Sequence, residues 1–301
     1  MMSRFSRLGH AIASAHRLMR WGACLAFLCG ALLLSACEPW WLPASGAPGL
    51  VNEPGGHISV AGSTTVQPLA EKLAEAFRAA HPEAQVEIDV MGGGSSVGVT
   101  SAGQRSVDVG MSSRELKEGE RAQYPDLRAV TIALDGIAVV VHPSTRVANL
   151  TTAQLRGVFA GQVADWQTLG GAAGSVFPVS REEGSGTRSA FEDMVMGKER
   201  ITGRAIFMPS NGSIRTTVGH TPGAIGYLSF GYVDETVRAV AADGVAPTEA
   251  NAASGAYPVV RPLILLTNGQ PPPRVQAWLD FILGADGQRL VAGEGYIPIS
   301  R

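Results

Sequence analysis

The chain repeats one order of elements: a short apolar strand, a turn rich in glycine and hydroxyl groups, and then a helix. Amphipathic spacing predicts helices over 68–80 and 96–104, another that opens at Thr151, and a last one over 274–283. Continuous or alternating apolar runs predict strands at 58–61, 86–90, 107–110, 136–141, 176–179, 223–227 and 262–266. Strands that alternate with helices predict an α/β fold with mainly parallel sheets, whose ligands bind at the carboxyl ends of the strands.

Three of the strand-to-helix turns share one design. They are Ala-Gly-Ser-Thr-Thr-Val-Gln-Pro at 61–68, Met-Gly-Gly-Gly-Ser-Ser-Val-Gly at 91–98 and Gly-Ser-Gly-Thr at 184–187. Each turn places backbone N–H groups, hydroxyl donors and the positive end of a helix dipole at one point, which favours an oxyanion. A single turn of this kind is explained equally well by helix capping, since Ser and Thr are ordinary caps. Three of them, the last preceded by Arg181 with its bidentate fork, indicate an anion site.

Motifs for nucleotide binding and for hydrolysis do not fit these turns. No lysine follows the glycines at 92–94 in the P-loop order, and the G-x-G-x-x-G order of dinucleotide sites is missing there. Glu183 stands directly before Gly184, so Ser185 does not lie in a nucleophile elbow. We therefore predict a binding protein with no catalytic residues, and a phosphatase-type hydrolase remains the enzyme alternative.

The first 36 residues predict a signal peptide. A basic leader precedes an apolar stretch over 21–34, which is short for a membrane-spanning helix of about 20 residues. The closing Leu-Ser-Ala-Cys at 34–37 resembles the signal of bacterial lipoproteins, which implies that Cys37 is the first mature residue and carries a lipid. A plain signal peptide or an uncleaved anchor is the alternative. Residues 37–56 are rich in proline and glycine and predict a flexible tether.

Charge and cysteine content limit the partners. The chain has 24 basic and 26 acidic residues, and removal of the leader with its four arginines leaves 20 against 26, a net charge of −6. With no basic stripe, nucleic acid is not an expected partner, and an anion has to be attracted by local donors. Cys37 is the only cysteine after the leader, so no internal disulfide is expected. No metal or cofactor site is predicted, because the remaining histidines are widely separated: His57, His81, His142 and His220.

Four ordered motifs carry a resemblance to a known family. They are Ala-Gly-Ser-Thr-Thr-Val (61–66), Gly-Gly-Gly-Ser-Ser (92–96), Val-Asp-Val-Gly-Met-Ser-Ser-Arg (107–114) and Arg-Glu-Glu-Gly-Ser-Gly-Thr-Arg (181–188). Together they resemble the phosphate-binding lipoproteins that feed ABC-type phosphate importers. The resemblance implies a two-lobed periplasmic-binding-protein fold of type II, the Venus-flytrap form. Lobe I would comprise 57–138 and 257–301, and lobe II would comprise 139–256.

The same resemblance implies partners and a place in the cell. The ligand would be inorganic phosphate, and the protein would be a monomer that delivers phosphate to the permease subunits of an inner-membrane ABC transporter. It would work in the periplasm or cell envelope, held to a membrane through the lipid on Cys37.

Site residues follow from the matching motif positions. The resemblance assigns phosphate binding to hydroxyl, backbone and charged donors of both lobes: Thr64, Thr65, Ser95, Arg181, Ser185, Gly186 and Thr187. Ser113 is added where some members of the family have an aspartate that accepts the proton of hydrogen phosphate and repels sulfate. Ser113 can accept a hydrogen bond but has no charge, so Glu183 is considered as another proton acceptor.

Selectivity therefore stays open at the level of the sequence. Sulfate, molybdate and tungstate are alternative ligands, and a lipoprotein with an adhesive or signalling role and a vestigial site is a third possibility.

Overall fold

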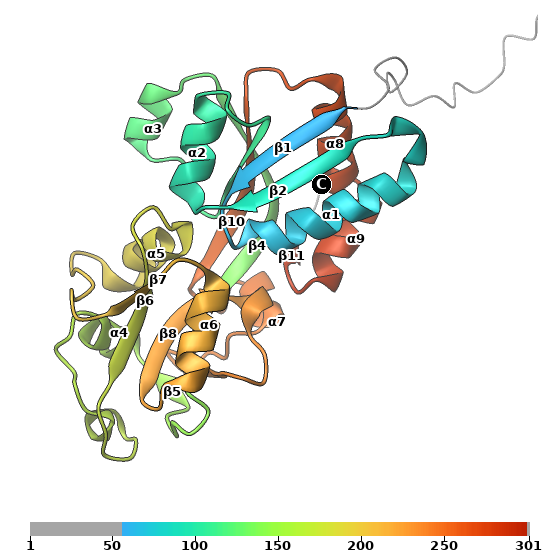
Figure 1. Ribbon diagram of the computed structural model, residues 1–301. Coiled ribbons are helices and arrows are strands. Elements are labelled where there is room, and N and C mark those ends of the chain that lie inside the picture. The colour runs from blue at the N-terminus through green and yellow to red at the C-terminus, as the bar shows by residue number, and fades with distance from the viewer. Residues whose placement is uncertain (1–55, 300–301) are drawn as a thin grey trace, which may run out of the picture. The chain divides into compact units, whose positions relative to one another are not determined.

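A computed structural model of the protein describes residues 56–299 (Figure 1). The predicted signal peptide, Cys37 and almost all of the predicted tether lie outside the described residues. Within them, two α/β lobes are joined by strand β4 (Leu127–Val141), which runs through both lobes. The first part of β4 pairs with β10 (Val260–Asn268) and its last part with β8 (Ala224–Ser229). A single strand thus continues from the sheet of one lobe into the sheet of the other.

The first lobe contains the start and the end of the described chain. Its sheet has the order β2-β1-β3-β10-β4, in which the first three strands run parallel and β10 is antiparallel to both of its neighbours. The first three strands are β1 (His57–Gly62), β2 (Glu87–Gly92) and β3 (Val109–Ser112). The helices are α1 (Val66–Ala80), η1 (Pro82–Ala84), α2 (Ser95–Gly103), α3 (Glu118–Gln123), α8 (Pro273–Leu283) and α9 (Ala285–Gly293). Helices α1, α8 and α9 cover one face, and α2 covers the other (Figure 1).

Helix α1 shows how the sequence specifies this packing. Its apolar residues recur every three or four positions, so they share one face, and that face is buried against the sheet. The helix ends at Ala80, because Pro82 follows His81 and the residue before a proline disfavours helical geometry. The N-terminus of the helix follows the carboxyl end of β1, and the first of the three turns lies between them.

The second lobe lies around the last part of β4. Its strands are β5 (Asn149–Leu150), β6 (Phe177–Arg181), β7 (Ile206–Met208), β8 and β9 (Arg238–Ala242). Its helices are α4 (Thr152–Phe159), η2 (Trp166–Leu169), α5 (Gly186–Phe191), η3 (Glu192–Met196), α6 (Asn211–His220), η4 (Phe230–Tyr232) and α7 (Glu249–Ala253). Strands β6, β7 and β8 run parallel to one another. The rings of Phe191 and Tyr227 stack with centroids 4.0 Å apart, which fixes α5 against β8.

Two expectations about the fold were wrong in detail. The sheet is mixed rather than mainly parallel. Strand β4 leads from the first lobe into the second and β10 leads back, so the two strands run in opposite directions and pair antiparallel. The helix over 274–283 is not the last, since α9 follows it after Gly284. The short strand β11 (Ile297–Pro298) then pairs with β4 near the crossing.

Among residues 56–299, no helix combines the length and the apolar character that a membrane span requires.

Candidate anion-binding site

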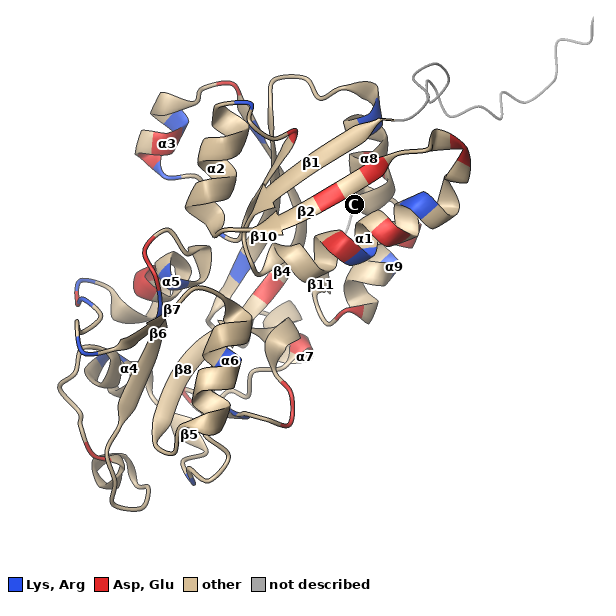
Figure 2. Cartoon of the chain, in the orientation of Figure 1, with Lys and Arg blue, Asp and Glu red and all other residues tan. Residues whose placement is uncertain are grey.

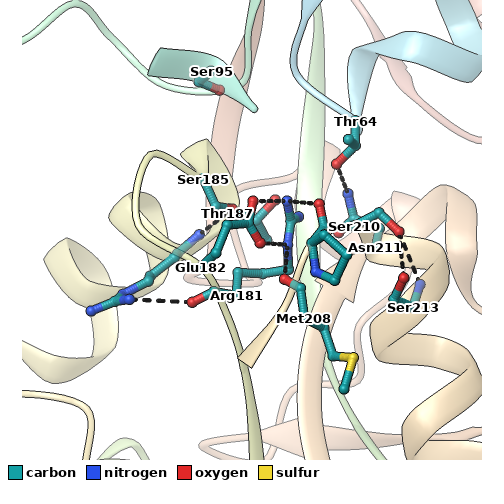
Figure 3. Close-up of polar contacts among 12 residues, drawn as sticks. Thr64, Ser95, Arg181, Glu182, Ser185, Thr187, Met208, Ser210, Asn211 and Ser213 are labelled. Atoms are coloured by element: carbon teal, nitrogen blue, oxygen red, sulfur yellow. Dashed lines mark hydrogen bonds and ion pairs between the residues drawn. The ribbon is translucent and has the colours of Figure 1, made fainter. Parts of the chain in front are cut away.

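The structure brings the three glycine- and hydroxyl-rich turns together. Thr64 and Thr65 precede α1, Ser95 begins α2, and Thr187 lies in the first turn of α5. The Oγ1 atoms of Thr65 and Thr187 are 3.2 Å apart, although the residues belong to different lobes. The backbone N–H of Ser96 donates across the same gap to the carbonyl oxygen of Gly184 at 3.0 Å. Figure 3 shows Ser95 and Thr64 on one side and Ser185 and Thr187 on the other.

Helix capping uses only some of the hydroxyls in these turns. Ser63 caps α1, because its Oγ accepts the N–H groups of Thr65 and Val66 at 3.2 and 3.4 Å. Ser185 caps α5 by accepting the N–H of Arg188 at 3.2 Å. The side chain of Thr65 caps nothing, and it is completely buried between the lobes. Capping therefore leaves hydroxyl groups in these turns that are available for a ligand.

Arg181 lies at the end of β6, where its side chain is almost completely buried. Its guanidinium donates to the carboxylate of Glu182 at 2.8 and 3.0 Å, and to the backbone oxygens of Met208 and Pro209 at 3.1 and 3.0 Å (Figure 3). The predicted cation of the site is thus held in place by Glu182, a partner that was not predicted. Glu183, the predicted proton acceptor, has an exposed side chain.

Ser95, Ser113 and Gly186 meet at the centre of the cluster. The N–H of Ser113 donates to Ser95 Oγ at 3.0 Å, and the two hydroxyl oxygens are 3.4 Å apart. A Cβ atom on Gly186 would lie 2.1 Å from Ser95 Oγ and 2.6 Å from Ser113 Oγ. Only glycine at position 186 therefore allows α5 to approach the first lobe this closely.

A buried ion pair that was not predicted contacts these hydroxyls. Arg261 of β10 and Asp135 of β4 are direct partners in the two crossing strands, and their side chains join at 2.9 Å. Burial raises the pKa of the Asp135 carboxyl, and the positive charge of Arg261 acts against that rise. Figure 2 shows a blue segment on β10 and a red segment on β4 in the middle of the fold.

The ion pair contacts both lobes. Arg261 donates to Thr65 Oγ1 at 3.0 Å and to Ser113 Oγ at 3.2 Å, both in the first lobe. Asp135 accepts the hydroxyl of Ser229, at the end of β8, at 2.8 Å. The available signal in the sequence was a charged residue flanked by apolar residues in each strand, Asp135 in β4 and Arg261 in β10, because a buried charge usually requires a partner.

Further contacts between the lobes come from α6 and from a tyrosine. Asn211, the first residue of α6, donates from Nδ2 to Thr65 Oγ1 at 2.9 Å. Tyr232 donates its hydroxyl to the carbonyl oxygen of Thr64 at 2.7 Å. Burial raises the pKa of Tyr232 to about 12, so this hydroxyl stays protonated at neutral pH. Neither residue was predicted, and Asn211 resembles an ordinary cap in the sequence.

The residues of this cluster offer hydrogen-bond donors and paired charges rather than a reactive group. Within residues 56–299, no three His, Cys, Asp or Glu side chains are grouped so that they could hold a metal ion. The hydroxyls of both lobes and the nearby Arg181 make a small, largely buried polar surface that suits an anion with several acceptor oxygens.

Two α/β lobes that share crossing strands, with a polar cluster where they meet, define a two-lobed solute-binding protein. The chain belongs to the PBP superfamily, since the profile of the PBP superfamily domain matches residues 49–286. It is 33% identical over 248 residues to the phosphate-binding protein PstS of Bacillus subtilis, and the match covers 81% of each chain.

Solved structures agree with this family. A phosphate ABC transporter substrate-binding protein from Clostridium perfringens, solved with bound phosphate, is 37% identical with a TM-score of 0.78, over 81% of this chain and all of the other. An ABC-type phosphate transport receptor from Vibrio cholerae is 33% identical with a TM-score of 0.67, over 80% of this chain and all of the other.

Proposed function

We propose that this protein binds inorganic phosphate between its two lobes and delivers it to the permease of an ABC transporter for uptake. The observation that carries the proposal is the meeting of hydroxyl-rich turns from both lobes, with Thr65 and Thr187 in direct contact. A ligand favours a closed form only through contacts with both lobes, and this cluster offers such contacts. The names of the relatives from B. subtilis, C. perfringens and V. cholerae support phosphate as the ligand.

The proposed phosphate-binding residues come from both lobes. Donors of the first lobe are Thr64, Thr65, Ser95 and Ser113, and donors of the second lobe are Arg181, Ser185, Gly186 and Thr187. The first lobe would comprise 57–138 and 257–301, and the second 139–256. Separate buried cores on either side of the Asp135–Gly136 step of β4 support a division into two lobes, and Ile137 and Ala138 pack in the cores of the second lobe.

We also infer that the mature protein is a monomer in the periplasm or cell envelope, anchored to a membrane by a lipid on Cys37. The Leu-Ser-Ala-Cys ending of the leader and the tether over 37–56 support this placement.

Calorimetric titration of the full-length chain in detergent micelles with phosphate tests the function. The expected Kd lies below about 1 μM. Thr187→Val removes one donor at nearly constant volume and should weaken binding about tenfold or more, since a hydrogen bond to a charged group contributes about 1.5–3 kcal/mol. Thr267→Val, at a buried threonine of β10 whose hydroxyl donates to the Gly269 carbonyl, is the matched control and should bind like the wild type. A titration without heat from phosphate, or equal Kd values for wild type and Thr187→Val, would contradict the proposal.

Another tetrahedral oxyanion is the second candidate ligand. Ser113 is uncharged and belongs to the hydroxyl cluster, so no carboxylate at this position repels sulfate. Glu183→Gln tests the other predicted acceptor: because the side chain is exposed, the variant should keep the wild-type ratio of phosphate to sulfate affinity.

A further inference from the structure

Arg261 is bound on one side and directed toward two hydroxyls on the other. Its Nε and Nη2 atoms donate to Asp135 Oδ2 at 3.2 and 2.9 Å. Its Nη1 and Nη2 atoms donate to Ser113 Oγ and Thr65 Oγ1 at 3.2 and 3.0 Å. Both charged side chains are almost completely shielded from solvent, so the guanidinium has no water to turn toward. Ser113 and Thr65 each therefore accept one hydrogen bond from a fixed cation.

Ser113 accepts a second hydrogen bond from Ser63. The Oγ of Ser63 already accepts the N–H groups of Thr65 and Val66, so its single hydrogen is free to donate, and it does so to Ser113 Oγ at 2.9 Å. A hydroxyl has two acceptor positions and one hydrogen. Both acceptor positions of Ser113 are thus occupied.

Thr65 is arranged in the same way. Its Oγ1 accepts from Arg261 and from Asn211 Nδ2, the latter at 2.9 Å. The orientation of the Asn211 amide is set by its other end, because Oδ1 accepts the N–H of Ser229 at 3.3 Å. Thr65 and Ser113 therefore have only their hydrogens left to offer.

The two hydrogens are available only toward the gap between the lobes. The remaining neighbour of Thr65 Oγ1 is Thr187 Oγ1 at 3.2 Å, and that of Ser113 Oγ is Ser95 Oγ at 3.4 Å, beside Gly186. Nearby carboxylates are already engaged: Asp135 by Arg261 and Ser229, and Glu182 by Arg181.

We propose that Arg261 is a positioning residue that fixes Ser113 and Thr65 as hydrogen-bond donors, so that the site accepts proton-free tetrahedral dianions such as sulfate as well as phosphate. This inference rests on the proposed function, since it concerns the ligand class of the same site. Hydrogen phosphate carries a P–OH group that gains from an acceptor, whereas sulfate presents acceptor oxygens alone. At these two positions the P–OH group finds a donor instead of an acceptor, and sulfate meets no repelling charge.

Separate calorimetric titrations of the full-length chain with sodium phosphate and sodium sulfate measure the ratio of the two Kd values. The sulfate Kd should lie within about tenfold of the phosphate Kd. Ser113→Asp introduces a carboxylate that accepts the P–OH proton and repels sulfate. This variant should raise the ratio of sulfate to phosphate Kd by about a hundredfold or more, since like charges placed at close range strongly disfavour the wrong ligand.

The double variant Arg261→Met with Asp135→Asn tests the positioning role itself. Removing both charges avoids an unpaired buried ion. Ser113 and Thr65 each regain an acceptor position, so the ratio should rise about tenfold, because the P–OH group then gains a hydrogen bond that sulfate cannot make. If Arg261 had a purely structural role, the double variant would weaken the binding of phosphate and of sulfate by the same factor and leave the ratio of the two Kd values unchanged. The matched control, Arg114→Met with Glu120→Gln, removes another buried arginine pair, whose bonds end on Ser96 and Glu115, and should keep the wild-type ratio.

The outcomes separate the two proposals. Phosphate heat without sulfate heat in the wild type overturns the donor-only site and leaves the proposed function intact. Sulfate heat without phosphate heat refutes the proposed function and supports the donor-only site, whereas absence of both overturns both. An unchanged ratio in a double variant with a cooperative thermal transition overturns the role of Arg261. If that variant does not fold, Ser113→Asp decides, and an unchanged ratio there overturns the inference.

Discussion

The substitution Gly186→Ala is expected to destabilise the closed form of the protein and to leave the stability of each lobe unchanged. The added Cβ would lie 2.1 Å from Ser95 Oγ and 2.6 Å from Ser113 Oγ, which is closer than Cβ atoms approach other atoms in proteins. Both serines are in the first lobe, whereas Gly186 begins α5 in the second lobe. The clash thus exists only while the lobes are together, and opening them removes it.

The magnitude follows from the cost of overpacking. Inserting a methyl group into a filled site costs about 1–3 kcal/mol. If that cost falls on the closed form alone, phosphate affinity decreases about 5- to 150-fold. Alanine at the start of a helix has no backbone strain here, because Gly186 is not among the residues with positive φ. The Tm without ligand should therefore stay within about 2 °C of the wild type.

Calorimetric titration with phosphate and a thermal melt without ligand test both halves of this prediction. Gly119→Ala is the matched control, since Gly119 also lies in the first turn of a helix and a Cβ there meets no atom within 4 Å. It should change neither quantity. Wild-type affinity in Gly186→Ala would refute the reasoning, because the lobes would then bind ligand without this close approach. A large fall in Tm with unchanged affinity would place the strain within a lobe.

Three further predictions concern charge and anchoring. Arg181→Ala should weaken phosphate binding about 10- to 150-fold in calorimetry, through loss of a charge-assisted bond; an unchanged Kd would mean that the anion binds elsewhere. Although burial acts to raise it, the hydrogen bond and charge of Arg114 and the amide of Lys117 hold the pKa of Glu120 below its ordinary value. A carboxylate whose pKa is lowered by folding stabilises the fold at neutral pH, and this stabilisation is lost when the carboxylate is protonated in acid. The free energies of unfolding in urea of the wild type and Glu120→Gln should therefore converge below about pH 4.5, and a difference that stays constant with pH would contradict this. Cys37→Ala should abolish incorporation of labelled fatty acid and release the chain from the membrane fraction; continued labelling would place the lipid on another residue.

The elements of the fold followed from local pattern. Helix α1 was predicted from its apolar face, and the last part of β4 from the continuous apolar run over 136–141, since both signals lie within a few consecutive residues. The first part of β4, over 127–135, was not predicted. The second helix of the C-terminal pair, α9, was missed because it has few apolar residues and buries only Gly287 and Val291. Short elements such as β7 were missed because three residues carry too little periodicity.

The site was predictable where its chemistry lies in one turn. The Ser-Thr-Thr turn at 63–65 and the turn at 184–187 each carry, within a few consecutive residues, the hydroxyl groups that predict anion binding. The structure brings the two turns together. Arg261 and Asp135 could not be paired from the sequence, because 126 positions separate them and only the register of β4 and β10 makes them partners. The pairing of Arg181 with Glu182 depends on the rotamers of neighbouring residues, which spacing alone does not define.

The first lobe is built from the beginning and the end of the described chain, and this has a consequence for the order of folding. Strand β3 of the first lobe pairs with β10, and the core around β1 includes residues of α8 and α9 near the end of the chain. The first lobe therefore cannot complete its sheet while the chain is still emerging, whereas the second lobe is made almost entirely of one continuous stretch. During synthesis the later lobe can fold first, and the earlier lobe exposes the unpaired edge of β3 until the last strands arrive.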